Sequence, residues 1–181
     1  MVELHSLTEP RKTKAEKNAI SRITEWKSVI IDAIMNDDEL TKLLHYDTTD
    51  ASFRPSLTEE ERRNLYNTKI FGYRYNPEIV DEATQFLTIG VSRFAPREGF
   101  RKVYENYTDG FIYFYVVVNQ QNMELENGYR QDLMVNRLHE LFHDNRFIGL
   151  GNLKWANLVE NWEHDNKLGG YALGFRVTEL T

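Results

Sequence analysis

The chain has 181 residues, 41% of them hydrophobic and 28% charged, a composition typical of a globular protein and not of a disordered one. One domain over residues 1–181 is expected at this length. The net charge of −6 argues against a nucleic-acid partner, because phosphate binding needs an excess of Lys and Arg. The absence of cysteine excludes disulfides and thiolate metal sites, and the apolar runs are too short to span a membrane, so we expect a soluble protein.

Helical periodicity dominates the N-terminal part of the chain. Residues 1–13 are expected to form an arm, and a helix is predicted from about Lys14 to Met35, because apolar residues recur there every three or four positions. These residues are Ile20, Ile23, Trp26, Val29, Ile30 and Ile34. A short helix is predicted at "ELTKLL". Residues 46–76 are predicted to be a surface excursion with one helix, which begins with Thr58 and Glu61 in the pattern of a capping box.

Two strands are predicted in the middle of the chain. The run "TQFLTIGVSRF" at 84–94 places Leu87, Ile89 and Val91 on one face, as a strand with one buried side does. The run "FIYFYVVVNQ" at 111–120 is rich in β-branched and aromatic residues, which favours a strand covered on both faces. The link at 95–110 is too long for a tight hairpin turn and is predicted to be a second surface excursion.

The C-terminal part continues with a helix and two strands. The helix is predicted over about 129–144, and the strands at "NLKWANLVENW" and "YALGFRVTEL". Trp155 and Trp162 lie on the first of these strands and are predicted to pack in the core or against the second strand. The order α-β-β-α-β-β indicates an α+β fold, with an antiparallel or mixed four-stranded sheet and helices packed on one face.

The predicted helix at 129–144 contains a motif that can carry chemistry. His139, Glu140 and His143 match the H-E-x-x-H pattern of zinc peptidases, in which two histidines bind zinc and the glutamate activates a metal-bound water. A third protein ligand is also needed. Candidates downstream are Glu160, Glu163 and His164. A zinc metallopeptidase is therefore one alternative for the function.

The surroundings of this motif favour another interpretation. One side of the helix must face the core, because it carries the apolar side chains of Met134, Leu138, Leu141 and Phe142. His139 and His143 fall on the polar side, which predicts that they line a solvent or interface face. A random sequence of this composition shows the motif at a rate of about 1 in 100. No P-loop, dinucleotide fingerprint or nucleophile elbow occurs either, so we predict no catalytic residue, no cofactor and no metal.

The order of the elements resembles a known family. An amphipathic helix leads into "DDELTKLLHYD", two strands follow, and a helix then carries the arginine-led run "YRQDLMVNRLHELF". The chain closes with two strands that end in "YALGFRVTEL". In these features, over most of Ile20 to Leu180, the chain resembles the tail terminator and neck proteins of tailed bacteriophages, which include head–tail joining and tail completion proteins. The "SLTEEERRNL" region and the longer N-terminus depart from that pattern.

The resemblance implies a non-enzymatic virion protein that forms a homo-oligomeric ring, expected to be a hexamer, on the head-proximal end of the tail tube. Its implied partners are the tail tube protein and a head–tail connector or stopper protein, with no nucleic acid or membrane required. Its implied location is the virion, after assembly in the host cytoplasm. The candidate interface residues are Arg97, Arg101, Lys102, His139 and His143. A monomeric protein-binding module is the third alternative.

Overall fold

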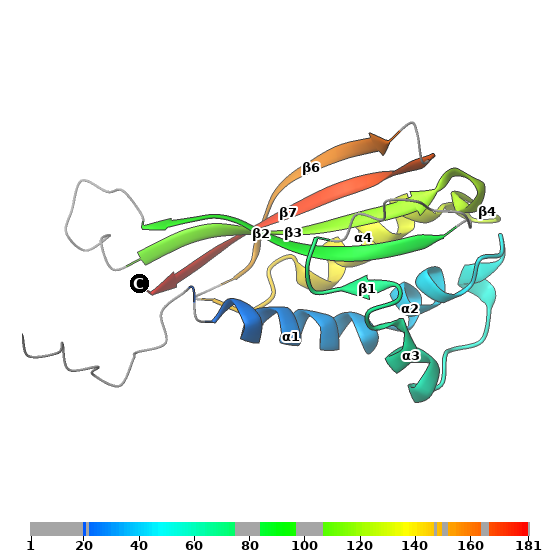
Figure 1. The fold of residues 1–181 in the computed structure, drawn as a ribbon, viewed down its shortest axis with the longest axis horizontal. Coiled ribbons are helices and arrows are strands. Elements are labelled where there is room, and N and C mark those ends of the chain that lie inside the picture. The colour runs from blue at the N-terminus through cyan, green and yellow to red at the C-terminus, as the bar shows by residue number, and fades with distance from the viewer. Residues whose placement is uncertain are drawn as a thin grey trace, which may run out of the picture.

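The structure is a computed structural model and describes residues 20, 22–74, 84–96, 107–146, 148–149, 152–163 and 167–180. It shows a mixed five-stranded sheet with helices packed on one face (Figure 1), so the predicted α+β class is confirmed. The predicted arm at residues 1–13, and Arg97, Arg101 and Lys102 of the predicted excursion at 95–110, lie outside the described residues.

The helical segments follow the predicted order. They are α1 (Ile23–Met35), α2 (Asp38–His45), η1 (Ala51–Phe53), α3 (Glu59–Leu65), η3 (Gln120–Asn122) and α4 (Arg130–Phe142). None of the helices in the described ranges has the length and apolar character needed to cross a membrane. Helix α1 begins at Ile23 instead of near Lys14, and Ile20, which was predicted to lie on its apolar face, is 70% exposed ahead of the helix.

The sheet contains one strand more than predicted. Its strands are β1 (Ile70–Phe71), β2 (Gln85–Pro96), β3 (Tyr107–Asn119), β6 (Lys154–Glu163) and β7 (Leu168–Leu180). They are arranged in the order β1-β2-β3-β7-β6, with β1 parallel to β2 and the other pairs antiparallel. A separate hairpin joins β4 (Glu124–Leu125) to β5 (Gly128–Tyr129). The two-residue strands were missed because they are too short to show any periodicity.

The core fills the space between the helices and one face of the sheet. Along β3, the core side chains alternate with half-buried ones, so the prediction of a strand covered on both faces was wrong. Buried Phe114 of β3 stacks on Phe142 of α4, with ring centroids 4.8 Å apart, and meets Phe175 of β7 edge to face. The other face of β3 carries aromatic residues that favour strands by propensity whether or not they are covered.

The segment at 46–76 is more than the surface excursion that we predicted. Ala51, Leu57, Leu65 and Ile70 are all buried and belong to the hydrophobic core, which also receives Leu40, Leu43 and Leu44 of α2. The predicted capping box is present at the start of α3, where the Thr58 hydroxyl accepts a hydrogen bond from the Glu61 N–H and the Glu61 side chain accepts one from the Thr58 N–H. Long polar stretches hid the few apolar side chains that attach this segment to the core.

Buried Arg130, the first residue of α4, fixes this helix to the segment around α2. Its guanidinium donates hydrogen bonds to the backbone carbonyls of Leu43, Tyr46, Thr48 and Asn122. Burial lowers the pKa of Arg130 from its ordinary value, and the charge of Asp47 partly offsets that effect. The last turn of α4, which carries His139 and leads directly into His143, therefore projects from a firmly anchored helix start.

Candidate functional site

The two histidines of the motif lie at the end of α4, and only one of them is on the helix. His139 belongs to the last turn, whereas the helix ends at Phe142 and His143 is the extended residue that follows, with φ −65° and ψ 134°. The two rings stack with their centroids 4.6 Å apart. Although the helix ends before His143, the N–H of this residue still donates a hydrogen bond to the carbonyl of His139 at 2.8 Å, so the one-turn spacing of the two histidines is kept and does not by itself decide against zinc.

His139 lies half-exposed beside the sheet edge, so it takes a partly covered position on the predicted solvent or interface face. Its ring meets Trp155 of β6 edge to face at 5.9 Å and lies 6.4 Å from the ring of Phe175 on β7. His143 is held beside the same strand, because its Nδ1 accepts a hydrogen bond from the backbone N–H of Trp155 at 3.2 Å. Its Nε2 lies 3.4 Å from an oxygen of Asp144. Both histidines are half-buried and tie the end of α4 to the start of β6.

Glu140 points to a different side of α4. Its carboxylate accepts a hydrogen bond from Arg137 Nη1 and another from Asn136 Nδ2, each at 2.9 Å. It borders a hollow next to α2 together with Glu39, whereas His139 borders a separate cleft against β6. In the part of the chain that the structure describes, no three His, Asp or Glu side chains are grouped so as to hold a metal ion. Of the candidate third ligands, Glu160 is an exposed residue of β6, and the side chain of Glu163 and the whole of His164 lie outside that part.

Arg137 links this side of α4 to the start of α2. Its guanidinium donates two hydrogen bonds to one oxygen of buried Asp37, from Nε at 3.0 Å and from Nη2 at 2.8 Å. The other oxygen of Asp37 caps α2 by accepting a hydrogen bond from the N–H of Leu40. Hydrogen bonds to Asp37 and then to Glu140 raise the pKa of Arg137 above its ordinary value. Glu140 is thus part of an ion-pair network that holds two helices together.

The cleft beside His139 lies between α4 and the last two strands. It has a volume of about 340 Å³. Its lining comprises Asp132, Val135, Asn136, His139, Trp155, Leu158, Tyr171 and Leu173. Burial, and then a hydrogen bond with Asp132, raises the pKa of Tyr171. Most of the lining is apolar or aromatic, and such a lining suits an apolar side chain better than a charged group.

Strand β6 continues this apolar surface outward. Four of its large side chains are exposed to an unusual degree, with Trp155 at 52%, Leu158 at 42%, Val159 at 49% and Trp162 at 43%. The two tryptophans were predicted to pack in the core or against the second strand; neither is in the core, but Trp162 lies against β7 over Gly169. The strand forms one edge of the sheet, and β7 is the only described strand that pairs with it (Figure 1). Its outer backbone N–H and C=O groups therefore face no other strand of the described chain.

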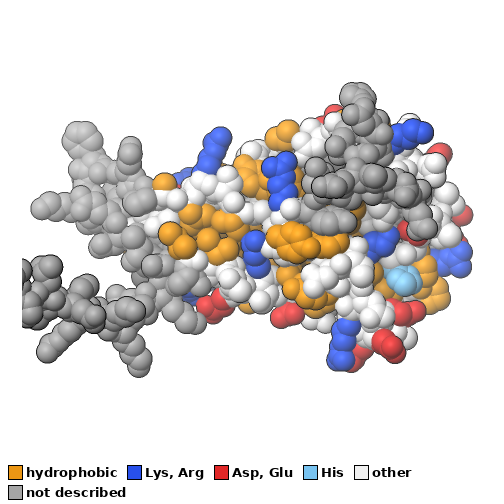
Figure 2. All heavy atoms as spheres, viewed as in Figure 1, with side chains coloured by type: hydrophobic (Ala, Val, Ile, Leu, Met, Phe, Trp, Pro, Cys, Tyr) orange, Lys and Arg blue, Asp and Glu red, His pale blue; other side chains and the backbone are white. Residues whose placement is uncertain are grey.

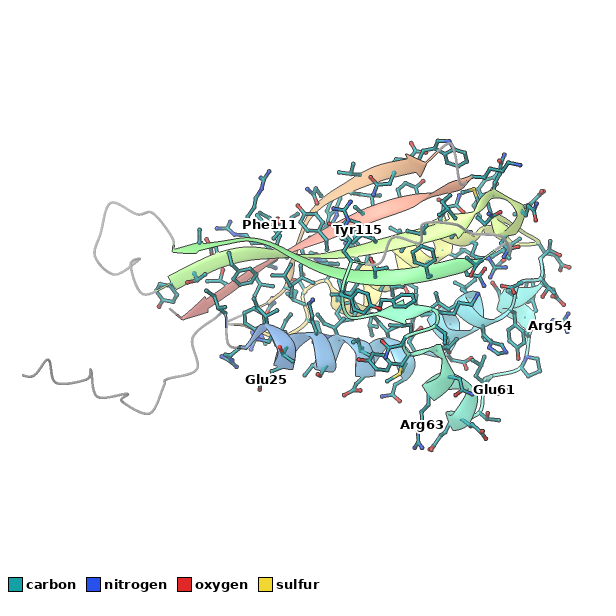
Figure 3. The ribbon with its side chains drawn as sticks, in the orientation of Figure 1. Glu25, Arg54, Glu61, Arg63, Phe111 and Tyr115 are labelled. Carbon is teal, nitrogen blue, oxygen red and sulfur yellow. The ribbon has the colours of Figure 1, made fainter. Side chains whose placement is uncertain are left out.

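A second apolar surface lies on the sheet face that the helices leave uncovered. Phe111, Tyr113 and Tyr115 of β3 form a ladder with ring centroids 6.1 and 6.0 Å apart, and the guanidinium of Arg74 sits over the Tyr115 ring at 5.2 Å. Figure 2 shows hydrophobic side chains gathered over the strands, and Figure 3 places Phe111 and Tyr115 along β3. Sequence reasoning missed both surfaces, since a strand pattern does not tell which strand is at the edge or which face stays open.

Comparison with known proteins adds one finding. A family model described as YomW matches residues 37–177, which run from the cap of α2 into β7 and make up more than half of the chain. No curated protein and no solved structure matches this chain. The chain therefore belongs to the YomW family, a phage-derived family, and is a phage-related protein.

Proposed function

We propose that this protein is a non-enzymatic virion assembly protein, a tail terminator or neck subunit that forms a ring, expected to be a hexamer, on the tail tube. In this role it caps the tube protein and joins the tube to the head connector or stopper protein. It is made in the host cytoplasm and ends in the neck of the virion. The observation that carries the proposal is the apolar open edge of β6 with the cleft beside it.

This edge has the chemistry of a contact between polypeptides. Proteins commonly protect an edge strand with charges, proline or a covering element, because its unpaired backbone groups can pair with another chain. Here the edge carries Trp155, Leu158, Val159 and Trp162, the kind of aromatic and apolar side chains that dominate protein interfaces. A small polar substrate gains little from such a surface, whereas a strand of another protein gains both hydrogen bonds and apolar burial.

The sheet and helices behind the β6 edge suit a subunit that keeps its shape in an assembly. Strands β3 and β7 pair over thirteen positions and form the centre of the sheet. On one side the core helices brace this pair, and Arg130 and Arg137 fix α4 to α2. A ring needs subunits that keep their shape while heterologous contacts close on themselves. Membership of a phage-derived family, together with the element order of tail terminator and neck proteins, supports the same role.

The arrangement of the H-E-x-x-H residues favours the non-enzymatic role over the metallopeptidase. Glu140 is engaged by Arg137 and Asn136 on one side of α4, while His139 faces the sheet on the other side. A base that activates a water shared with the histidines has to lie on their side of the helix.

Tail tubes assembled without the protein provide the test. Purified protein is added to such tubes, and negative-stain imaging and native mass spectrometry record where it binds and in how many copies. We expect density at one tube end, an end to further elongation and no effect of a chelator. A strict monomer that never binds tubes would argue against the assembly role, and proteolysis that a chelator abolishes would revive the peptidase.

A further inference from the structure

The pairing of β6 with β7 fixes where each side chain of β6 points. Trp155 lies opposite Phe175 and Leu158 opposite Leu173, and both partners are core residues, so these two side chains project on the helix side. An irregularity between Trp155 and Asn157 makes Ala156 an extra residue in the register. Trp162 lies over Gly169 on the helix side, and Val159, opposite Ala172, points to the other side.

The helix side of β6 is open to a neighbour. Helix α4 packs over β3 and β7, and the cleft takes up the space between α4 and β6. A further strand can therefore extend the sheet beyond β6 without meeting any of the described helices. Such a strand would cover Trp155, Leu158 and Trp162 from the helix side.

We propose that the open edge of β6 is occupied in the free protein by β6 of a second copy, paired antiparallel about a two-fold axis at Val159. Positions along β6 are counted by their partners on β7, so that Ala156 is skipped. This axis then sets Val159 opposite Val159 of the second copy and Asn157 opposite Asn161. It also sets Trp155 opposite Trp162, with both rings on the helix side. Like residues thus meet at Val159, at the asparagines and at the tryptophans, although Leu158 faces Glu160; this near-palindrome about one axis favours a second copy as the occupant.

The area fits a weak but specific contact. An aromatic side chain buries about 150–250 Å², so the two half-exposed tryptophans offer about 200 Å² per copy. With Leu158, Val159 and the strand backbone, two copies bury on the order of 800–1,000 Å², below the range of about 1,200–2,000 Å² for stable interfaces and within that of weak, transient contacts. The dimer is therefore reversible and is expected to dissociate on dilution.

One pair in this register is unfavourable and gives a sharp test. Glu160 lies opposite Leu158 of the second copy, so the two glutamates are diagonal neighbours on the same side of the joined sheet. Diagonal positions are about 7–8 Å apart, close enough for two carboxylates to repel each other. The Glu160→Gln variant should therefore dimerise about threefold or more strongly than the natural protein, which a generic apolar contact does not predict.

The β6 pairing adds a specific contact to the proposed function, and it rests on that function only for the premise that copies of the chain associate. A two-fold contact joins two subunits and does not close a ring around a single axis, so the ring needs further, heterologous contacts. The two proposals can therefore fail separately.

Cross-linking is decisive because the chain has no cysteine. Val159→Cys should form a disulfide-linked dimer under mild oxidation, since residues directly opposite lie about 4.5–5.5 Å apart at Cβ. Leu158→Cys is the matched control: it is similarly exposed but lies diagonal to its own copy, too far for a disulfide. Circular dichroism checks that both variants fold.

Selective cross-linking of Val159→Cys, together with tighter dimerisation of Glu160→Gln, is the expected result. Equal cross-linking of the two cysteine variants, or none from a folded Val159→Cys, overturns the pairing. If tubes are capped without this cross-link, the pairing fails and the proposed function stands. If the cross-link forms but tubes are never capped, the pairing stands and the proposed function fails.

Discussion

Removing the Arg130 side chain should cost the fold about 4 kcal/mol. The residue is fully buried, and its guanidinium is the donor for four backbone carbonyls. Nε lies 2.7 Å from the oxygen of Asn122, Nη1 lies 2.5 Å from that of Leu43 and 2.8 Å from that of Tyr46, and Nη2 lies 3.0 Å from that of Thr48. Arg130→Ala leaves a buried hole at the start of α4 and takes this donor away from all four carbonyls, of which the Thr48 carbonyl keeps another partner, the Ala51 N–H at 3.2 Å.

The magnitude follows from what those acceptors lose. A buried acceptor without a partner costs about 1–3 kcal/mol, and water that enters the hole satisfies part of the set. Taking about 1 kcal/mol for each of the four lost hydrogen bonds gives about 4 kcal/mol. A small domain is stable by only about 5–15 kcal/mol, so the loss should be plain. The variant no longer buries a charge, and this gain makes the loss of stability smaller than the sum over all the lost hydrogen bonds.

Urea unfolding followed by circular dichroism measures the effect. Arg130→Lys should recover less than half of the loss, because one ammonium does not reach four carbonyls in the arrangement of a guanidinium. Arg63→Ala is the control, since Arg63 and Glu59 form an exposed pair, and it should change the free energy of unfolding by about 0.5 kcal/mol or less. A loss below about 1 kcal/mol for Arg130→Ala, with an unchanged urea dependence, would refute the reasoning.

Three further predictions concern other parts of the molecule. Hydrogen bonds within the capping box of α3 lower the pKa of Glu61, so its contribution to stability is present above its unfolded pKa and is lost as pH falls through the folded pKa. The difference in urea midpoint between the natural protein and Glu61→Gln should therefore shrink below about pH 4. A difference that stays constant with pH would contradict this. Gly170 has φ +149°, and a Cβ there would lie 2.1 Å from the carbonyl oxygen of Val116. Gly170→Ala should therefore destabilise the fold by about 3 kcal/mol or more, whereas Gly128→Ala, where a Cβ has open space, should cost about 1 kcal/mol. Equal shifts in melting temperature for the two variants would argue against this reasoning. Purified protein should contain less than one zinc per chain by elemental analysis, with no change in His139→Ala, and stoichiometric zinc lost in that variant would reverse the assignment.

Much of the fold was readable from side-chain periodicity. The stripe of α4 comes from burial of one face, and burial is what hydrophobic patterns record. Along β2, Leu87 and Ile89 are buried as the pattern predicts, but Phe86 and Thr88 on the opposite face are buried too, so the expected single buried side was wrong there. The capping box of α3 was readable because Thr58 and Glu61, three residues apart, bond to each other and to nearby backbone. Strand β1 and the β4–β5 hairpin were missed, since pairing between short segments depends on distant partners.

The site could be predicted only in part, for similar reasons. The H-E-x-x-H pattern does not reveal that Glu140 is engaged by Arg137 and Asn136, away from the two histidines. Trp155 and Trp162 look like core residues in sequence, but the strand order puts β6 at the edge and leaves them exposed. Edge position depends on how all the strands assemble, so no local pattern in β6 reveals it.

Tail length in phage particles that lack this protein tests the central claim most directly. If the protein is the subunit that ends tail growth and joins tail to head, then deletion should give tails of irregular, often excessive length and few tails joined to heads, as seen by electron microscopy. Supplying the natural protein should restore a single tail length. Tails of normal length joined to filled heads in the deletion would contradict the assembly role.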